Sequence, residues 1–252
     1  MSPKISAVII TYNEEKNIRR CLASLQGIAE EIVVVDSHST DRTKEICSQY
    51  ENVNFISTDW KGFSDTKNYG NDIAKHSWII SLDSDEELSK ELKTNIASLE
   101  LKEENAYEFN RLTNYCGKWI KHCGWYPDIK VRLFNKSITS WEGVVHEKLV
   151  YTKSISTELI IGDLNHYSYY TEQEHLDRLK KYAQLSAEEK FKAKKGNENY
   201  KIIFSPIFKF ISVFFLKLGF LDGITGFKIA KNEAKYNYWK YSILKKLHQT
   251  NA

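Results

Sequence analysis

The chain has 252 residues, of which 42% are hydrophobic and 27% charged. These values are typical of a globular protein with a well-filled core, and they exclude a disordered or collagen-like chain. The net charge of +3 combines a slightly acidic part, residues 1–170, with a basic part, residues 171–252. We therefore expect the basic part to face an anionic partner. The sequence has none of the compact DNA- or RNA-reading motifs, so we expect no nucleic-acid partner.

Strand and helix patterns alternate over the first hundred residues. Apolar runs rich in β-branched residues predict strands at 5–12, 31–37, 53–58 and 77–83. Stretches with apolar residues at helical spacing predict helices at 14–26, 39–50, 63–75 and 89–100. This alternation indicates an α/β fold with a mostly parallel sheet and helices on both faces. The N-terminus enters the first strand almost at once, so we expect no signal peptide.

The texture changes after residue 105. Short aromatic runs between residues 107 and 163 indicate antiparallel strands that extend the sheet. A helical pattern begins at Thr171 and continues to the end of the chain. We therefore expect a domain of residues 1–170, with halves 1–104 and 105–170, followed by a helical region of residues 171–252.

Polar side chains gather where the predicted parallel strands end, which is the edge at which open parallel sheets bind ligands. They are Thr11, Tyr12, Glu14, Asp36, Asp83 and Asp85. The glycine-rich loops GxGxxG and GxxxxGK[ST] are absent, so the phosphates of a bound nucleotide would need a cation. Asp83 and Asp85 form a D-x-D that offers hard oxygen ligands to Mg²⁺ or Mn²⁺. The alternative is a solvated, acidic start of the next helix.

Four stretches together resemble the nucleotide-sugar-binding half of glycosyltransferase family 2, which has the GT-A fold. They read VIITYNEEKNIRRCLASL, EIVVVDSHSTDRT, KNYG and WIISLDSDEEL. Later stretches resemble the branch that contains bacterial lipopolysaccharide-core β-1,4-glucosyltransferases and related capsule enzymes. These read WYPDIKVRLFN, GVVHEKL, LNHYSY and GFLDGITGF.

The resemblance implies roles for individual residues of the donor site. Four residues match positions that hold the uridine in that family: Thr11, Tyr12, Glu14 and Asp36. Asp83 matches the acid near the ribose and the metal, and Asp85 matches the acid that binds the metal. Lys67 matches a basic position near the diphosphate.

An inverting transfer also needs a carboxylate that accepts the proton of the acceptor hydroxyl. Glu147 is our first candidate, because it follows an apolar pair and matches the HE position of the family. Glu142 and Asp128 are the alternatives. For the last metal ligand we expect His166, which follows the final predicted strand, with His146 as the alternative.

Aromatic and basic residues of the second half are candidates for acceptor contacts. Trp125 offers a ring on which a sugar could stack, and core packing is the alternative. Arg132 could hold a phosphate or carboxylate of the acceptor, and an internal ion pair is the alternative. The apolar stretch 202–221 is interrupted by Pro206 and lysines, so it predicts an interfacial helix better than a membrane-spanning one.

The sequence thus predicts a metal-dependent, inverting transfer of a hexose, glucose in the first instance, from a UDP-sugar. The expected acceptor is a lipopolysaccharide core, a capsule or a related lipid-linked glycan. The expected location is cytoplasmic, peripheral on the inner membrane, with the basic region on anionic lipid. A polyprenyl-phosphate glycosyltransferase and an inactive glycan-binding relative are the alternatives.

Overall fold

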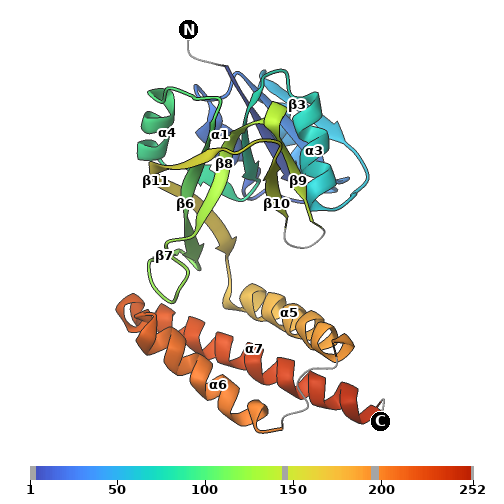
Figure 1. The fold of residues 1–252 in the computed structure, drawn as a ribbon, viewed down its shortest axis with the longest axis vertical. Helices are drawn as coiled ribbons and strands as arrows, with labels where there is room; N and C mark the ends of the chain where they lie inside the picture. Colours follow the sequence, from blue (N-terminus) through green and yellow to red (C-terminus); the bar gives the residue numbers. More distant parts are fainter. Residues whose placement is uncertain (1–3, 144–146, 194–198, 251–252) are drawn as a thin grey trace. The chain divides into compact units, whose positions relative to one another are not determined.

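The structure is a computed structural model that describes residues 4–143, 147–193 and 199–250. The chain forms two compact units. Unit 1 comprises Met1–Arg111 and Asp128–Tyr167, and unit 2 comprises Leu112–Pro127 and Ser168–Ala252. Figure 1 shows the strands of unit 1 in blue to yellow and the helices of unit 2 in orange to red.

Unit 1 is built on parallel strands in the order β3-β2-β1-β4. Their bounds are β1 (Ile5–Thr11), β2 (Glu31–Asp36), β3 (Val53–Ser57) and β4 (Trp78–Asp83). Helices follow each of them: α1 (Ile18–Leu25), α2 (Thr43–Cys47), α3 (Phe63–Ile73) and α4 (Lys90–Ala97). The predicted α/β class is therefore confirmed. The strands β1 and β2 are buried along their whole length, which explains why they read as continuous apolar runs.

Helices cover both faces of this sheet. On one face the apolar positions of α1 and α4 join alternate residues of the strands in the larger hydrophobic core. On the other face α3 lies so close to the strands that a Cβ at Gly70 would come within 2.5 Å of Val8 Cγ1. Glycine permits this approach because it has no side chain.

Antiparallel strands extend the sheet beyond β4 in the order β8-β6-β11-β5. Their bounds are β5 (Glu86–Leu88), β6 (Asn105–Tyr115), β8 (Ile129–Asn135) and β11 (Ser156–Tyr169), with β7 (Lys118–Ile120) paired to β6. Strands β9 (Thr139–Glu142) and β10 (Lys148–Tyr151) form a separate pair. The extension confirms the expected antiparallel addition. Strand β11 runs further than its apolar pattern predicted, so His166 lies within it and not after it.

Strand β5 was not predicted from the sequence. Its acidic residues read as a helix start or a ligand site, and three residues give too short a pattern to recognise. The structure pairs β5 with β11 and places Glu86 in the interior, where arginines hold it. The helix begins only after it, with Ser89 as its N-cap.

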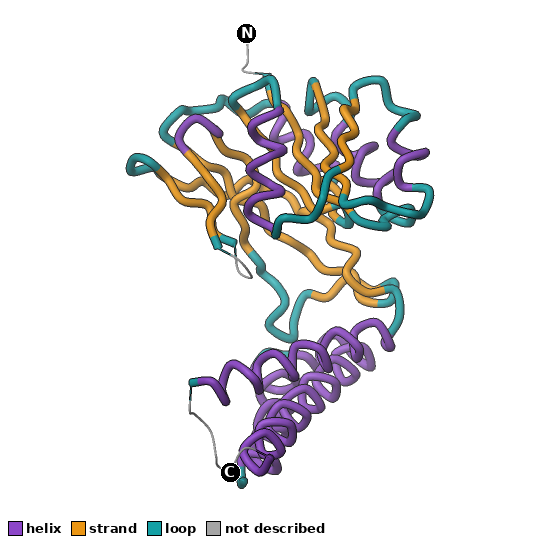
Figure 2. The backbone as a smooth tube through the Cα atoms, turned by 90° about the vertical axis from the view of Figure 1, so that its right-hand side faces the viewer, coloured by secondary structure: helices purple, strands orange, loops and turns teal. Residues whose placement is uncertain are grey.

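Unit 2 contains the helices α5 (Glu172–Lys192), α6 (Lys201–Ile211) and α7 (Gly223–Thr250). Thr171 and Glu174 form a capping box at the start of α5. Helix α7 packs against both α5 and α6 (Figures 1 and 2). The apolar stretch after residue 201 is not one helix, because a π-helical turn at Ser212–Leu216 and a short 3₁₀ turn at Gly219–Asp222 follow α6.

No single helix in the described part of the chain is long and apolar enough to cross a membrane. Two helical segments, Lys201–Leu216 and Gly219–Thr250, meet this test of length and composition only as a pair, and they are bent by 72°.

Candidate functional site

The carboxyl ends of the parallel strands bring three predicted residues to one edge of unit 1. Thr11 is the register partner of Asp36, and Ile10 is the partner of Asp83. Because β1, β2 and β4 are adjacent and parallel, their ends meet at this edge. The sheet therefore assembles the edge from positions far apart in the sequence.

The part of this edge at β1 and β2 combines an ordered carboxylate with open side chains. Asp36 is buried, and it accepts hydrogen bonds from Ser39 and, at 3.1 Å, from the hydroxyl of Ser57. The hydroxyl of Thr11 is buried without a hydrogen-bond partner among the described residues. Tyr12 is 59% exposed. These groups leave an unused donor and an open ring at the strand ends.

Glu14 belongs to the loop that follows β1. Its carboxylate accepts a hydrogen bond from Asn17 at 2.7 Å, and its backbone N–H donates to the hydroxyl of Thr43 at 2.9 Å. The loop is therefore tied to the start of α2, which positions Glu14 beside the strand ends.

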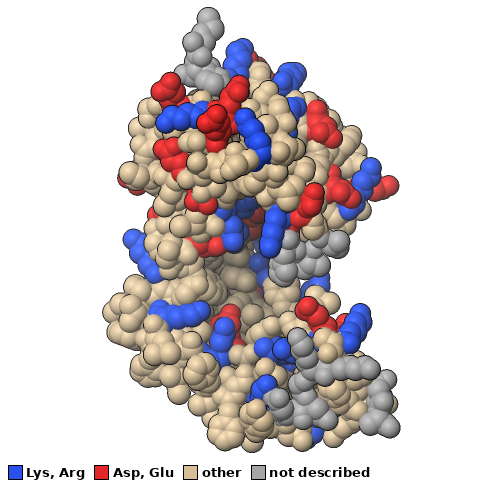
Figure 3. Space-filling model, viewed as in Figure 1, with Lys and Arg blue, Asp and Glu red and all other residues tan. Residues whose placement is uncertain are grey.

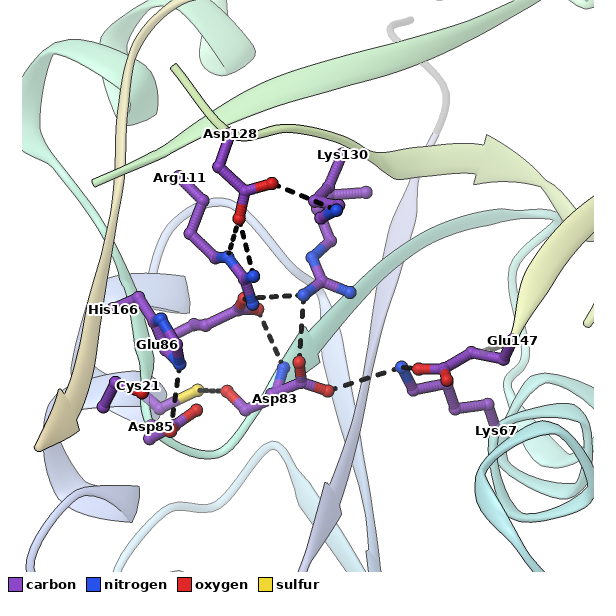
Figure 4. A network of polar contacts seen from close by, with 12 residues as sticks. Cys21, Lys67, Asp83, Asp85, Glu86, Arg111, Asp128, Lys130, Glu147 and His166 are labelled. Carbon is purple, nitrogen blue, oxygen red and sulfur yellow. Dashed lines mark hydrogen bonds and ion pairs between the residues drawn. The ribbon is translucent and has the colours of Figure 1, made fainter. Parts of the chain in front are cut away.

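Asp83, at the end of β4, is the centre of a charged network (Figure 4). Lys67 Nζ lies 3.4 Å from Asp83 Oδ1, and Arg132 Nη2 lies 2.9 Å from Asp83 Oδ2. Burial by itself raises the pKa of Asp83, but the charges of Lys67 and Arg132 outweigh it and hold this pKa well below its usual range. Asp83 is therefore an ionised carboxylate.

Lys67 connects Asp83 to Glu147. The ammonium of Lys67 lies 2.9 Å from Glu147 Oε1, and its side chain is only 2% exposed. Burial raises the pKa of Glu147, but the charge of Lys67 lowers it overall, so Glu147 is ionised at neutral pH. The structure thus brings together the predicted diphosphate-side lysine, the predicted ribose-side acid and the predicted base.

Glu86 and Arg111, which sequence reasoning missed, complete the network. Glu86 is fully buried, and its carboxylate lies 2.6 Å from Arg132 and 3.5 Å from Arg111. It also accepts a hydrogen bond from the backbone N–H of Asp83 at 3.0 Å. Glu86 therefore fixes both the backbone of Asp83 and the arginine that binds its side chain. The one signal in the sequence that could have indicated this role was the position of Glu86, an acid three residues after Asp83.

The alternative base candidates have other surroundings. Asp128 lies 2.6 Å from Arg111 and 3.0 Å from Lys130. Burial raises the pKa of Asp128, but Arg111 lowers it overall. Glu142 ends β9 and is exposed.

Asp85, directly before β5, lies beside His166 of β11. His166 Nε2 lies 3.2 Å from Asp85 Oδ2, and both side chains are mostly buried. The backbone N–H of Tyr167 donates to the carbonyl of Asp85 at 2.9 Å, which fixes the turn after β4 against β11. Among the described residues, no group of three or more His, Cys, Asp or Glu side chains is arranged to hold a metal. His146 lies outside the described residues.

The two predicted acceptor residues belong to different units. Arg132, in unit 1, directs its guanidinium to Asp83 and Glu86, and its side chain is 6% exposed. Trp125, in unit 2, packs against aromatic rings of that unit, those of Tyr115, Tyr169 and His175. In the structure, the surroundings of both residues are those of the packing and ion-pair alternatives.

Comparisons with known proteins identify relatives of the chain. Residues 6–123 match the model of the family described as glycosyl transferase family 2. An uncharacterized glycosyltransferase of Rickettsia bellii is 31% identical over 90% of this chain and 81% of its own length. A lipopolysaccharide core biosynthesis glycosyltransferase of Rhizobium meliloti is 26% identical over 100% of this chain and 96% of its own length.

Among solved structures, S. aureus TarS in complex with UDP-GlcNAc is 16% identical, with a TM-score of 0.49 over 98% of this chain and 92% of that chain. The relatives in sequence reach across both units and well beyond the segment that the family model covers. The chain therefore belongs to glycosyltransferase family 2.

Proposed function

We propose that this glycosyltransferase moves a hexose, glucose in the first instance, from a UDP-sugar to a glycan acceptor with inversion at the anomeric carbon. The observation that carries the proposal is the Asp83–Lys67–Glu147 arrangement at the carboxyl end of the parallel sheet. Thr11, Tyr12, Glu14 and Asp36 hold the uridine at the neighbouring strand ends, where an unused hydroxyl and an exposed ring are available.

Glu147 is the general base of the proposed reaction. Its ionised carboxylate accepts the proton of the acceptor hydroxyl while that oxygen forms a bond to the anomeric carbon. The bond from the anomeric carbon to the diphosphate breaks at the same time, and UDP leaves with the electron pair. Lys67 keeps Glu147 ionised and holds it against Asp83.

Asp85 and His166 fit a divalent cation, Mg²⁺ or Mn²⁺, as two of its ligands. Their donor atoms are 3.2 Å apart, and the carboxylate of Asp85 is a type of ligand that suits Mg²⁺ and Mn²⁺. Two protein ligands suffice only if the diphosphate and water supply the others, as is usual for Mg²⁺ sites. When bound there, the cation would neutralise the charge that develops on the diphosphate.

The proposed acceptor is a lipopolysaccharide core or a related lipid-linked glycan. The relative from Rhizobium meliloti, which covers the whole chain, supports this class of acceptor. A lipid-linked acceptor and a UDP-sugar meet at the cytoplasmic face of the inner membrane, so we propose that the enzyme works there as a peripheral protein.

Hydrolysis of UDP-sugars tests the donor and the metal without knowledge of the acceptor. We expect slow release of UDP from one UDP-hexose, stimulated by Mn²⁺.

Glu147→Gln should retain UDP binding and lower transfer by about 10²-fold or more, because it keeps the shape but loses basicity. Glu142→Gln is the matched control and should transfer normally. If Glu142→Gln is the inactive variant, the base has been assigned to the wrong residue.

A further inference from the structure

Helix α6 presents a continuous apolar face to the surroundings. The side chains of Ile203, Phe204, Ile207, Phe208 and Ile211 are all at least 43% exposed, and so is Phe215 in the π-helical turn that follows α6. They repeat at intervals of four residues, so they share one side of the helix. The structure describes all of α6, and none of its residues is buried. Isolated exposed apolar residues are ordinary, but a contiguous patch of this kind marks an interaction surface.

The apolar surface continues beyond α6 into the turn and the start of α7. Phe220, at 45%, and Ile224, at 72%, are exposed there. In Figure 3, the part of unit 2 where Figure 1 draws α6 is mostly uncharged, with Lys and Arg side chains at its margins. We call the exposed apolar residues between Ile203 and Phe227 the apolar face of unit 2.

Lysines outnumber acids around this face. Residues 199–250 contain nine lysines and two acids. Of these acids, Asp222 is buried, and Glu233 lies 3.1 Å from Lys209. An apolar face with a cationic border matches a surface that is apolar inside and anionic outside.

A groove between α6 and α7 shares Ile207 with this face. It has a volume of about 470 Å³, and Ile207, Phe210 and Tyr238 contribute to its apolar lining. Lys231 and Lys235 also line it. Because the lysines contribute mainly their aliphatic stems, the lining is almost entirely apolar, and the groove suits the acyl chain of a lipid.

We infer that the apolar face of unit 2 docks onto a lipid bilayer that contains anionic phospholipids. Phenylalanine and isoleucine side chains enter the headgroup boundary, and the lysines contact lipid phosphates. This inference specifies the membrane contact of the proposed function, but its test requires no transferase activity.

Flotation of the full-length protein with vesicles tests the inference. At low salt, the protein should float with vesicles of phosphatidylcholine mixed with phosphatidylglycerol. Much less of the protein should float with vesicles of phosphatidylcholine alone. The double variant Phe204→Ser/Phe208→Ser should bind the anionic vesicles about tenfold more weakly or worse, equivalent to about 1.4 kcal/mol. The matched control is Leu159→Ser/Ile161→Ser, because these residues of β11 in unit 1 are 48% and 70% exposed.

A second pair of variants tests the charges. Lys231→Glu/Lys235→Glu should weaken binding to anionic vesicles and reduce its dependence on salt. Lys44→Glu/Lys90→Glu, on exposed positions of unit 1, should bind like the unmodified protein. Circular dichroism and thermal unfolding show whether each variant is folded.

Two results would overturn the inference. One is a folded protein that does not float with any of the vesicles, or a Phe204→Ser/Phe208→Ser variant that floats as well as the unmodified protein. The other is a dimer in light scattering that this variant converts to monomers without any effect of lipid, which would make the face an interface between copies.

Donor hydrolysis is measured separately in the absence of vesicles. An active protein that ignores lipid refutes only the docking surface, and an inactive protein that binds lipid refutes only the proposed reaction.

Discussion

Replacing Lys67 by methionine tests the charged network most directly. The ammonium of Lys67 lies 2.9 Å from Glu147 and 3.4 Å from Asp83, and only 2% of its side chain is exposed. Methionine fills a similar volume without the charge. The variant therefore leaves two neighbouring carboxylates without the cation between them, while Asp83 keeps Arg132 at 2.9 Å.

The expected loss of stability follows from the burial of the three groups. Removing one partner of a buried ion pair costs about 3–5 kcal/mol. Because the side chains of Glu147 and Asp83 are 22% and 32% exposed, water compensates in part, and we expect about 3 kcal/mol. This corresponds to a decrease in Tm of roughly 6–12 °C at this chain length. Lys44→Met, at an exposed position of α2, is the control and should stay within about 0.5 kcal/mol.

The same variant should change the pH dependence of transfer. In the folded protein Lys67 lowers the pKa of Glu147. The pair therefore stabilises the folded state at pH values above the pKa that Glu147 has in the unfolded chain, and this stabilisation is lost as the pH falls through the pKa of Glu147 in the folded protein. Without Lys67 the pKa of Glu147 rises, and the acid limb of the transfer rate against pH moves to higher pH. Transfer rates measured between about pH 4 and pH 8 show this shift. An acid limb that does not move in a folded variant would contradict the assignment of Glu147 as the base held by Lys67.

Three other substitutions have defined outcomes. Asp85→Ala should weaken Mn²⁺ binding, measured by electron paramagnetic resonance, by about 10–100-fold and abolish Mn²⁺ stimulation of hydrolysis; unchanged binding would exclude Asp85 as a ligand. Burial lowers the pKa of His175 to about 4, so the folded state stays neutral while the unfolded chain takes up a proton. Its contribution to stability is therefore lost between about pH 6.5 and pH 4, by up to about 3 kcal/mol, and His175→Phe should lack this loss in denaturant titrations at the two pH values; equal losses in both proteins would refute it. Gly70→Ala should lower the free energy of unfolding by about 1–3 kcal/mol, because the new Cβ meets Val8, and a normal Tm would contradict that close packing.

Local patterns were sufficient to predict the parallel half of the fold. The runs that became β1, β2 and β4 are apolar because both faces of the sheet are covered, and that requirement is written in consecutive residues. The ends of such strands meet at one edge, so Asp36 and Asp83 could be placed together before any coordinates. Family membership followed from the same stretches and is confirmed by the relatives.

Short or irregular elements could not be predicted in this way. Strand β5 has three residues, and its acids carry no alternation to recognise. The sequence could not show that Glu86 is buried, because a buried acid is stable only beside cations, and those cations come from β6 and β8. The π-helical turn after Ile211 and the bend after Leu216 were also hidden, since the composition of the apolar stretch suits a continuous helix.

The sequence by itself determined the parallel part of the sheet, the edge at which its polar residues gather and the family of this enzyme, because each depends on the order of neighbouring residues. Only the tertiary structure decided which charges meet. Lys67 and Glu147 are 80 residues apart, and no local pattern relates them until Lys67 of α3 meets Glu147, the residue before β10, in unit 1. The exposure of α6 is likewise a tertiary property: the same phenylalanines would be core residues if another element covered them, and the fold leaves them uncovered.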